Sequence, residues 1–409
     1  MRTKLADWDA PAPKLFTDGT HRTATVEATL QKIGPLFGKA GITRIANITG
    51  LDRIGVPVVM AIRPGSRGLS VSQGKGMSLV AAQVSAIMEA LESFHAENTA
   101  LDLILASYAE LKNGRRLLDP AGMIQYVRNP YAETDRVLWV EGIDLLSGNG
   151  TLVPFDCVHA DFAIRPPVGT GSFPINTNGL ASGNHILEAT CHAICELIER
   201  DALTLWEALD DAVRLSTQVD PQSVTDASCR EMLDVLDRAG VSYVIWNVTS
   251  DIAVPAFFCQ IRDRHQGASR TAIHAGGSGC HLDAGIALLR SISEAVQSRL
   301  TAIAGSRDDL SFALYRTLTG SVSEFAEGAQ PPVMSFRSVP SLATPTFEGD
   351  LAVLKNMVAA AGLGPVVAVD LSRDDMNIPV VRVVIPGLES AAISEEYTIG
   401  RRLRGRKSA

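Results

Sequence analysis

The chain has 409 residues, of which 46% are hydrophobic and 20% are charged, and its formal net charge is −8. A chain of this length and composition can bury a large core, as expected of a globular, enzyme-sized protein. The acidic balance argues against duplex nucleic acid as a partner, because a broad basic face would be needed to displace its counterions.

Neither membrane insertion nor secretion is indicated by the sequence. No apolar run reaches the roughly 18 residues that a membrane helix needs, and the N-terminal residues lack the pattern of a secretory signal. The six cysteines are scattered without a CxxC pair, which is typical of reduced, buried thiols rather than of a disulfide framework. We therefore expect a cytoplasmic protein with no membrane partner.

The first elements are predicted from local signals. Residues 1–18 are polar and marked by prolines, which favours a mobile surface segment. A helix is predicted over 26–33, with Thr25 as its N-cap, and a strand-rich stretch follows it. Residues 65–76 form a glycine- and serine-rich loop ending in a GKG sequence that contains Lys75. We interpret this loop either as a plain connection or as a phosphate-facing segment before the next helix.

Three predicted helices, at 78–98, 184–201 and 281–300, each carry a polar stripe at positions i, i+4 and i+7. A solvated helix face is the alternative for any one stripe, but such a face normally mixes Lys and Arg into the stripe. The stripes are Ser85, Glu89 and Glu92; His192, Glu196 and Glu199, with Glu188 three turns before Glu199; and Arg290, Glu294 and Gln297, with Arg299 close behind.

The rest of the chain is predicted to alternate between strands, turns and loops. A glycine-containing turn at 147–150 indicates a hairpin, and the segment 328–346 has the composition of a lid-like loop. The other predictions are strands at 137–140, 152–154, 241–248, 256–261, 366–369 and 380–385, a small-residue loop at 276–281, and a disordered basic tail at 401–407.

The glutamate stripes suggest a metal site. Like charges repel at this spacing and half-buried carboxylates lose hydration, so a divalent cation is the simplest partner for them. Oxygen ligands without clustered His or Cys suit Mg²⁺ with a nucleotide better than zinc. Arginines such as Arg22, Arg290 or Arg299 would meet the phosphates, and a hydroxyl such as Thr29 or Ser85 would donate to a phosphate oxygen.

Other chemistry stays open at this level. Cys191, His192 and Cys195 lie within about one helix turn, a spacing that a zinc site can use, although no fourth ligand is evident. A cysteine nucleophile would need an orienting His/Asn pair, which no cysteine has nearby in the sequence.

Five segments, in order, resemble the YcaO superfamily: GTHRTATVEATL, GKGMSLVAAQVSAIMEALE, NTNGLASGNHILEATCHAICELIERDA, GCHLDAGIALLRSISEAVQSR and VVRVVIPGLE. The resemblance implies an α+β YcaO fold, in which mixed sheets and packed helices form a glutamate-lined site for ATP and Mg²⁺. It also implies a YcaO domain over 19–400, with an N-terminal portion at about 19–66, an ATP-binding core at about 67–305, a C-terminal portion at about 306–400, and tails at 1–18 and 401–409.

The resemblance also implies roles for residues at matching positions. The carboxylates that hold Mg²⁺ would be Glu89, Glu92, Glu188, Glu196 and Glu199. Catalysis would rest on Glu89, Glu92, Glu196, Glu199 and Arg299. Nucleotide contacts would come from Arg22, Thr29, Lys75, Asn178 and Glu188, together with Ser85 and Gln297 of the polar stripes.

In proteins that resemble this chain, ATP activates a peptide backbone amide toward a nucleophile. A neighbouring side chain gives an azoline, whereas external sulfide gives a thioamide. The C-terminal residues GRRLRGRKSA contain no PxPxP tail, and no extra leader-binding domain is evident, which favours the thioamide branch with a TfuA-like sulfur-delivering partner. We therefore predict a homodimer that forms thioamides in a ribosomally synthesised peptide or protein, with azoline formation as the alternative.

Two hypotheses from other classes also stay open. The chain would be a nucleotide-binding accessory protein if it potentiated another protein-modifying enzyme without turning over a peptide itself. It would be a glutamate-bridged metal hydrolase if an activated water gave activity without ATP.

Overall fold

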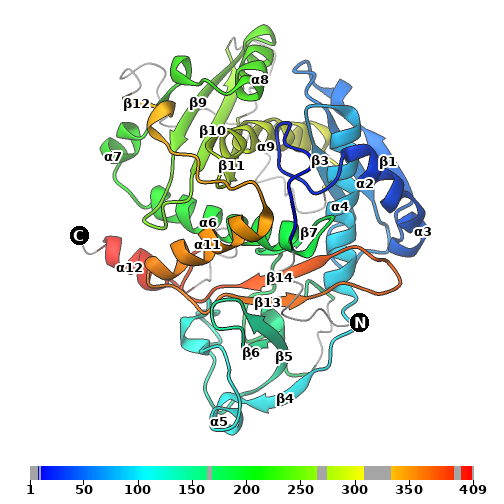
Figure 1. Ribbon diagram of the computed structural model, residues 1–409, viewed down its shortest axis with the longest axis vertical. Coiled ribbons are helices and arrows are strands. Elements are labelled where there is room, and N and C mark those ends of the chain that lie inside the picture. The colour runs from blue at the N-terminus through cyan, green and yellow to red at the C-terminus, as the bar shows by residue number, and fades with distance from the viewer. Residues whose placement is uncertain are drawn as a thin grey trace.

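The computed structural model of the protein describes residues 8, 11–163, 168–264, 274–307, 333–390 and 398–407, of which 406 and 407 are described by their backbone alone. Mostly antiparallel sheets pack with helices, which confirms the predicted α+β class. Figure 1 shows two sheet-and-helix units above a larger sheet. The helix α6 (Ile186–Glu207) contacts both the larger sheet and one of the units.

The two units share one plan, in which three antiparallel strands are followed by a long helix. Side chains cap the N-termini of both helices, because Ser78 accepts from Ala81 N and Asp283 accepts from Ile286 N. The first unit is β1 (Arg44–Asn47), β2 (Val58–Ile62), β3 (Val71–Lys75) and α4 (Leu79–Glu97), and the second is β9 (Val241–Asn247), β10 (Ala256–Asp263), β11 (Ala275–Cys280) and α9 (Ala284–Ala304).

The link between the first two strands of each unit is built from the same hydrogen bonds. In the first unit, Thr49 donates to Asn47 Oδ1 from its backbone N at 3.0 Å and from Oγ1 at 2.6 Å, and Oγ1 accepts from Val58 N at 3.1 Å. In the second unit, Thr249 donates to Asn247 Oδ1 from N at 3.0 Å and from Oγ1 at 2.6 Å, and its Oγ1 accepts from Ala256 N at 3.0 Å. The NxT pattern, at residues 47–49 and 247–249, therefore marks an internal repeat that was not predicted from the sequence.

Glycines allow each long helix to lie directly on the third strand of its unit. A Cβ at Gly74 would lie 2.0 Å from a backbone nitrogen of α4, and one at Gly277 would lie 2.2 Å from a backbone nitrogen of α9. Only glycine permits such a close approach. The predicted loops at 65–76 and 276–281 are therefore wrong in part, because they contain strands β3 and β11, and their small residues serve helix packing.

The larger sheet carries α6 on one face. Its strand order is β4-β5-β13-β14-β7, and β6 pairs with β5. The tight connection between β5 and β6 confirms the hairpin predicted at 147–150. The strands are β4 (Ile104–Ser107), β5 (Arg136–Asp144), β6 (Gly150–Pro154), β7 (Leu180–Ser182), β13 (Val367–Asp370) and β14 (Val380–Val384).

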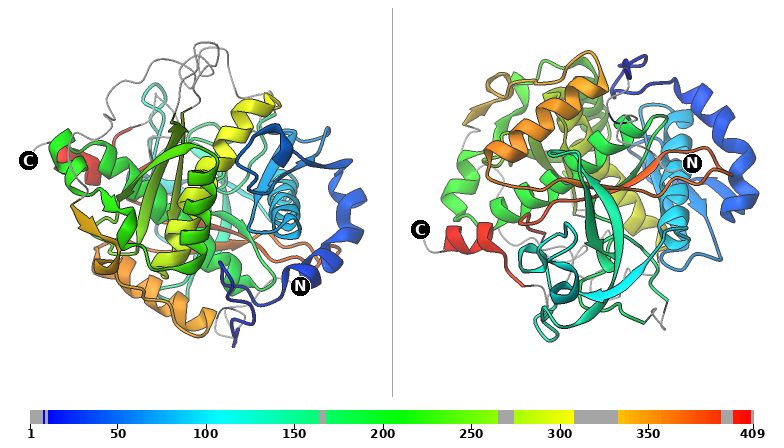
Figure 2. Two further views of the ribbon diagram at one scale, coloured as in Figure 1. Left: turned by 90° about the horizontal axis from the view of Figure 1, so that it is seen from above. Right: turned by 60° about the horizontal axis from the view of Figure 1, so that its bottom comes forward.

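The remaining elements surround this framework. Figure 2 shows α11 in orange and α12 in red, and both helices contact α6. These elements are α2 (Val26–Ile33), α3 (Phe37–Ala40), α5 (Tyr108–Leu111), α7 (Asp211–Ser216), β8 (Val219–Asp220), α8 (Ala227–Arg238), β12 (Met334–Ser335), α11 (Phe347–Ala360) and α12 (Arg401–Lys407).

Three apolar clusters fill the spaces between the layers. One lies between α6, α11 and the larger sheet, a second lies between α4 and the larger sheet, and a third lies among α8, α9 and the β9–β11 sheet. Burial of these apolar faces sets the rotation of α4, α6 and α9 about their axes. The polar stripe of each helix therefore points away from the core that its own helix covers.

Both terminal segments differ from the predictions in their described parts. Trp8 is only 3% exposed and donates from Nε1 to Thr190 Oγ1 at 2.9 Å, so this residue is fixed on α6. The basic residues predicted as a disordered tail form α12, in which Arg402 pairs with buried Asp201 at 2.9 Å and with Asp251 at 2.6 Å. A buried carboxylate needs such a partner.

The predicted lid-like loop is fastened where the structure describes it. Residues 328–332 lie outside the described part, but β12 pairs with β8, and Ser341 Oγ accepts from Ala284 N at 3.0 Å at the start of α9. These bonds tie residues 333–346 to the second unit. No helix in the described ranges is both long and apolar enough to span a bilayer.

Candidate active site

Carboxylates of the polar stripes of α4, α6 and α9 lie within electrostatic reach of one another. Repulsion links five carboxylates: Glu89 raises the pKa of Glu92, Glu92 and Glu199 raise that of Glu196, and Glu294 raises that of Glu199. The last of them, on α9, also acts on the first, on α4, so the sequence of neighbours closes. We call this group the carboxylate ring; its members are Glu89, Glu92, Glu196, Glu199 and Glu294.

The ring is an unfavourable arrangement for the protein alone. Burial is the main cause that raises the pKa of Glu92 and of Glu196 to about 7, and repulsion by neighbouring glutamates adds to it. The pKa of Glu199 is also raised, first by burial and then by Glu294. Glu89 is exposed to solvent, whereas Glu199 is buried, so the ring extends from the surface inward. Such a group favours binding of protons or of a cation.

Donors from two different strands hold individual ring members. Ser182, at the end of β7, donates to Glu92 Oε1 from N at 2.9 Å and from Oγ at 2.7 Å. Ser278 of β11 donates from Oγ to Glu199 Oε1 at 2.6 Å. These bonds fix the carboxylate positions by joining each glutamate helix to a strand of another part of the fold.

Cations stand at the edge of the ring. Lys75 Nζ lies 2.9 Å from Glu294 Oε2, and Arg200 lies 3.9 Å from Glu196 Oε1. Arg290 Nη1 lies 3.0 Å from His192 Nδ1, which must accept because an arginine only donates. Burial, and then the charge of Arg290, lower the pKa of His192 well below its usual value. Positive groups beside carboxylates suit an anion that arrives together with a metal.

The donor set fits Mg²⁺ with a polyphosphate rather than a closed protein cage. In the described ranges, no three His, Cys, Asp or Glu side chains converge as a ready metal-ligand group. Mg²⁺ does not require one, because it keeps several waters and takes one or two carboxylates plus phosphate oxygens. The carboxylate oxygens of the ring would supply the one or two protein ligands of Mg²⁺, and the flanking cations would bind the phosphates.

The N-terminal end of α6 forms a separate polar site. Glu188 Oε2 accepts from Thr23 N and Oγ1, both at 2.9 Å, and Glu188 Oε1 lies 3.5 Å from Arg22 Nε. At 1.5 Å of rise per residue, Glu188 lies about 16 Å along the helix from Glu199. One ion cannot bind both, so the structure separates Glu188 from the other predicted metal ligands. Glu188 and Arg22 line a small hollow of about 290 Å³.

Several other predicted residues have protein partners away from the ring. Arg299 is 3% exposed and pairs with Asp52 at 2.8 Å and with Asp263 at 3.2 Å. Arg299 was predicted to face phosphate; its side chain pairs with Asp52, in the link between β1 and β2, and with Asp263 of β10. Thr29 Oγ1 donates to Thr25 O at 2.9 Å or to Asn184 Oδ1 at 3.1 Å, beside the Glu188 site.

The remaining predicted contacts are divided among several places. Ser85 lies one turn before Glu89 on α4, on the same side of the helix. Gln297 donates from Nε2 to Gln73 O at 3.2 Å, on the side of α9 that contacts β3. Asn178 donates from Nδ2 to Ser390 Oγ at 3.2 Å and lines a different hollow, beyond the ring.

The cysteines and histidine that suggested zinc engage separate partners. Cys191 Sγ lies 3.6 Å from Phe347 O, His192 faces Arg290, and Cys195 lies beside Cys280. Burial raises the pKa of Cys191 well above its usual value, so this thiol stays protonated.

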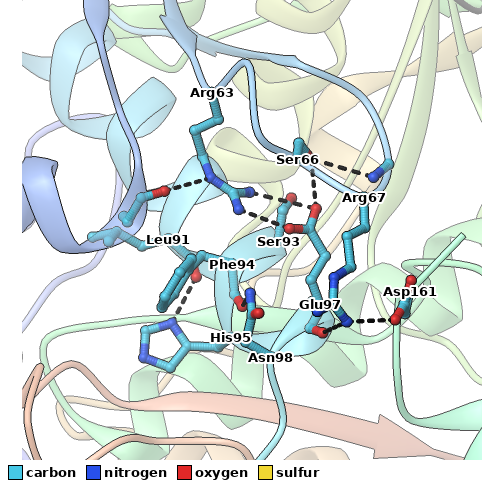
Figure 3. A network of polar contacts seen from close by, with 12 residues as sticks. Arg63, Ser66, Arg67, Leu91, Ser93, Phe94, His95, Glu97, Asn98 and Asp161 are labelled. Atoms are coloured by element: carbon cyan, nitrogen blue, oxygen red, sulfur yellow. Dashed lines mark hydrogen bonds and ion pairs between the residues drawn. The ribbon is translucent and has the colours of Figure 1, made fainter. Parts of the chain in front are cut away.

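A further glutamate of α4 serves the fold. Figure 3 shows Glu97 between Arg63 and Ser66, with distances of 2.7 Å to Arg63 Nη2 and 2.6 Å to Ser66 Oγ. Both charged side chains are buried, so their mutual contact fixes the C-terminal end of α4. This network leaves Glu89 and Glu92 as the α4 carboxylates that face the other stripes.

Two members of the site were absent from the residues predicted to act in it, whereas Arg290 was among the arginines predicted to meet a phosphate. Glu294 stood in the third stripe, but a stripe alone does not reveal which helix it will face. Arg200 follows Glu199 directly and lies one turn after Glu196, an i, i+4 spacing that supports a charge pair. That spacing was the available signal for Arg200.

A family model described as YcaO cyclodehydratase, ATP- and Mg²⁺-binding, matches residues 73–389, a range that includes the whole carboxylate ring. The chain belongs to the YcaO family. A protein of Rhizobium leguminosarum bv. trifolii, named for its place in the tfuA 3′ region, is 35% identical over 406 residues and covers 96% of this chain and 95% of its own length.

Other relatives and solved structures agree with this assignment. A Methanothermobacter thermautotrophicus protein is 34% identical over 389 residues, covering 92% of this chain and 97% of its own length. YcaO from Methanopyrus kandleri, solved with AMPPCP and Mg²⁺, has a TM-score of 0.74 at 24% identity and covers 95% of this chain and 98% of its own. A heterocyclase solved with substrate and cofactor has a TM-score of 0.77 at 20% identity; it covers 95% of this chain, which spans 55% of it. These two likenesses confirm the YcaO fold.

Proposed function

We propose that the protein uses ATP and Mg²⁺ to activate a backbone amide of a ribosomally synthesised peptide or protein, and that external sulfide then gives a thioamide. ATP would supply the phosphoryl group that turns the amide oxygen into a phosphate leaving group, and sulfide would supply the sulfur. The carboxylate ring carries this proposal, since its crowded negative charge needs a cation. The relative named for the tfuA 3′ region supports thioamide formation and a TfuA-like partner.

The roles of individual residues follow from their surroundings. Glu89, Glu92, Glu196 and Glu199 would hold Mg²⁺, with Glu294 as an additional ligand or as the partner of Lys75. Lys75, Arg200 and Arg290 would neutralise phosphate oxygens. Arg22 and Glu188 would hold the nucleotide at the N-terminal end of α6, with Thr29 as a nearby hydroxyl group, and Ser85 would donate from α4 one turn before Glu89. The protein would then act through positioning and charge neutralisation, and no side chain would have to form a covalent bond.

Mass spectrometry of a candidate precursor peptide tests the proposal. The peptide is incubated with the protein, ATP, Mg²⁺ and sulfide, with and without a TfuA-like protein, and a reaction without ATP serves as the control. Replacement of one oxygen by sulfur is the expected mass change. Loss of one water would instead indicate azoline formation, and an unchanged peptide in every mixture would contradict the proposal.

A further inference from the structure

A second hollow, of about 600 Å³ and open to solvent, lies beyond the C-terminal half of α6. α6 contributes residues that follow the ring members Glu196 and Glu199 by one position, and β14 and the segment after it form another wall. We call it the arginine pocket; the residues that matter here are Ile124, Asn178, Leu197, Arg200, Arg382 and Ile385.

Arg382 is buried in the pocket wall with one donor unused. The side chain is 2% exposed, and its two terminal nitrogens donate to Asn176 O and Oδ1, both at 2.9 Å. Its Nε has no hydrogen-bond partner, and no carboxylate of the described residues forms an ion pair with it. A buried guanidinium without an anion is costly, so an acceptor supplied from outside would stabilise it.

Arg200 gives the pocket a second unused donor. Its Nε is also buried without a hydrogen-bond partner, and its nearest carboxylate contact is the 3.9 Å approach to Glu196. The other charged group in the wall, Glu389, is occupied, because it accepts from Gly400 N at 2.9 Å and from Leu403 N at 3.1 Å. The pocket therefore offers hydrogen-bond donors, and the carboxylate of Glu389 already accepts hydrogen bonds from the protein backbone.

The rest of the wall is largely apolar and includes Ile124, Leu197 and Ile385. An inorganic anion would satisfy the arginines but would leave this apolar surface wet. A peptide segment satisfies both requirements, because its carbonyl oxygens accept hydrogen bonds and an apolar side chain buries the wall. The place is also suitable, since Arg200 joins the pocket directly to the carboxylate ring.

We propose that the arginine pocket binds the peptide substrate beside the amide that is modified. Backbone carbonyl oxygens would accept from Arg200 and Arg382, and one apolar side chain of the peptide would contact Ile124 and Leu197. This inference rests on the proposed function, and it deepens that function by specifying an apolar residue close to the modified position.

Two blocked tripeptides, N-acetyl-Leu-Gly-Leu-amide and N-acetyl-Asp-Gly-Asp-amide, serve as probes. Each is titrated into the full-length protein with AMPPCP and Mg²⁺, and binding is followed by NMR of the peptide. We expect the leucine peptide to bind at least about tenfold more tightly. Ile124→Trp, which fills the pocket, should weaken the leucine peptide by about tenfold or more and leave AMPPCP binding within about twofold.

Val127→Trp is the matched control, because Val127 lies in the same segment but is 60% exposed and outside the pocket. Arg382→Met should weaken the leucine peptide by about tenfold, with thermal unfolding used to show that the variant folds. If Arg382→Met does not fold, the Ile124→Trp and Val127→Trp pair decides the outcome.

Four results would overturn the inference: no binding of the leucine peptide to the wild type, equal binding of the two peptides, unchanged binding by Ile124→Trp, or loss of AMPPCP binding by Ile124→Trp. The last result would make the hollow part of the nucleotide site. The proposed function fails separately, if wild-type protein leaves every precursor peptide unmodified while the leucine probe still binds.

Discussion

Lys75 and Glu294 form an ion pair with a distance of 2.9 Å between Nζ and Oε2, although 219 positions separate them in the chain. Lys75 ends β3 of the first three-stranded unit, and Glu294 lies in the middle of α9 of the second. The contact therefore joins the two repeated units at the carboxylate ring. Burial alone would raise the pKa of Glu294, but nearby positive charges lower it, and Lys75 has the largest of these lowering effects.

Replacing Lys75 by methionine should separate the binding of Mg²⁺ from that of nucleotide. The variant loses a positive charge beside the proposed phosphate site, so we expect AMPPCP to bind about tenfold more weakly. Mg²⁺ alone should bind no more weakly, because the ring becomes more negative. Calorimetric titration measures the binding of AMPPCP and of Mg²⁺. Lys112→Met is the control, because Lys112 forms an ion pair with Glu133 on the exposed surface. Unchanged AMPPCP binding would place the nucleotide elsewhere.

Glu199→Gln keeps the shape of the side chain and an oxygen that can accept from Ser278, but it removes one ring charge. We expect the variant to fold and to lose Mg²⁺-dependent turnover by at least about 100-fold, as for loss of a transition-state charge contact. Glu207→Gln, on the exposed end of the same helix, should retain turnover. Full activity of the Glu199 variant would remove this residue from the site.

The stability of the protein without Mg²⁺ should fall as pH rises from about 4.5 to about 7. The pKa values of Glu92 and Glu196 are raised to about 7 in the folded protein from an ordinary value of 4.5, so the folded state binds more protons in this window. The contribution of these two glutamates to stability is fully present below their pKa in the unfolded chain, about 4.5. It is lost as the pH rises through their pKa in the folded protein, about 7.

Thermal unfolding across that window measures the effect. The double variant Glu92→Gln, Glu196→Gln should show a flatter dependence, and exposed Glu27→Gln should leave the dependence as it is in the wild type. Addition of Mg²⁺ with AMPPCP should displace the protons and also reduce the slope. A wild-type slope of the opposite sign in the absence of ligand would disagree with the ring as described.

Arg299→Met should reduce stability rather than nucleotide affinity. The substitution leaves buried Asp52 without its arginine, while Asp263 keeps Arg53, and breaking such a buried pair typically costs about 3–5 kcal/mol of unfolding free energy. Chemical denaturation measures this cost, and AMPPCP titration of the folded variant should match the wild type within about twofold. Weaker AMPPCP binding at unchanged stability would restore the phosphate role first predicted for Arg299.

Much of the site was predictable because helices repeat locally. A spacing of three residues placed Glu89 with Glu92 and Glu196 with Glu199 on common helix faces. Flanking Ala, Ile and Leu indicated that these faces were not ordinary solvent faces. The resemblance to the YcaO family, confirmed by the family model, identified the fold class without any coordinates.

Other features depended on how distant segments pack. Arg299 follows the third stripe closely, yet its position on α9 turns it toward Asp263 of β10 and toward Asp52 in the link between β1 and β2. The glycine-rich segments before α4 and α9 are strands because a helix lies against them, and no local signal distinguishes such a strand from a loop.

By itself, the sequence determined which side chains share a helix face, since backbone periodicity is a property of neighbouring residues. The tertiary structure alone decided which faces meet. It brought Glu294 and Lys75 to the ring, moved Glu188 to a separate hollow, and placed Arg382 and Arg200 in the wall of one hollow. These meetings depend on the burial of apolar surface by segments that are far apart in the chain, which no local pattern encodes.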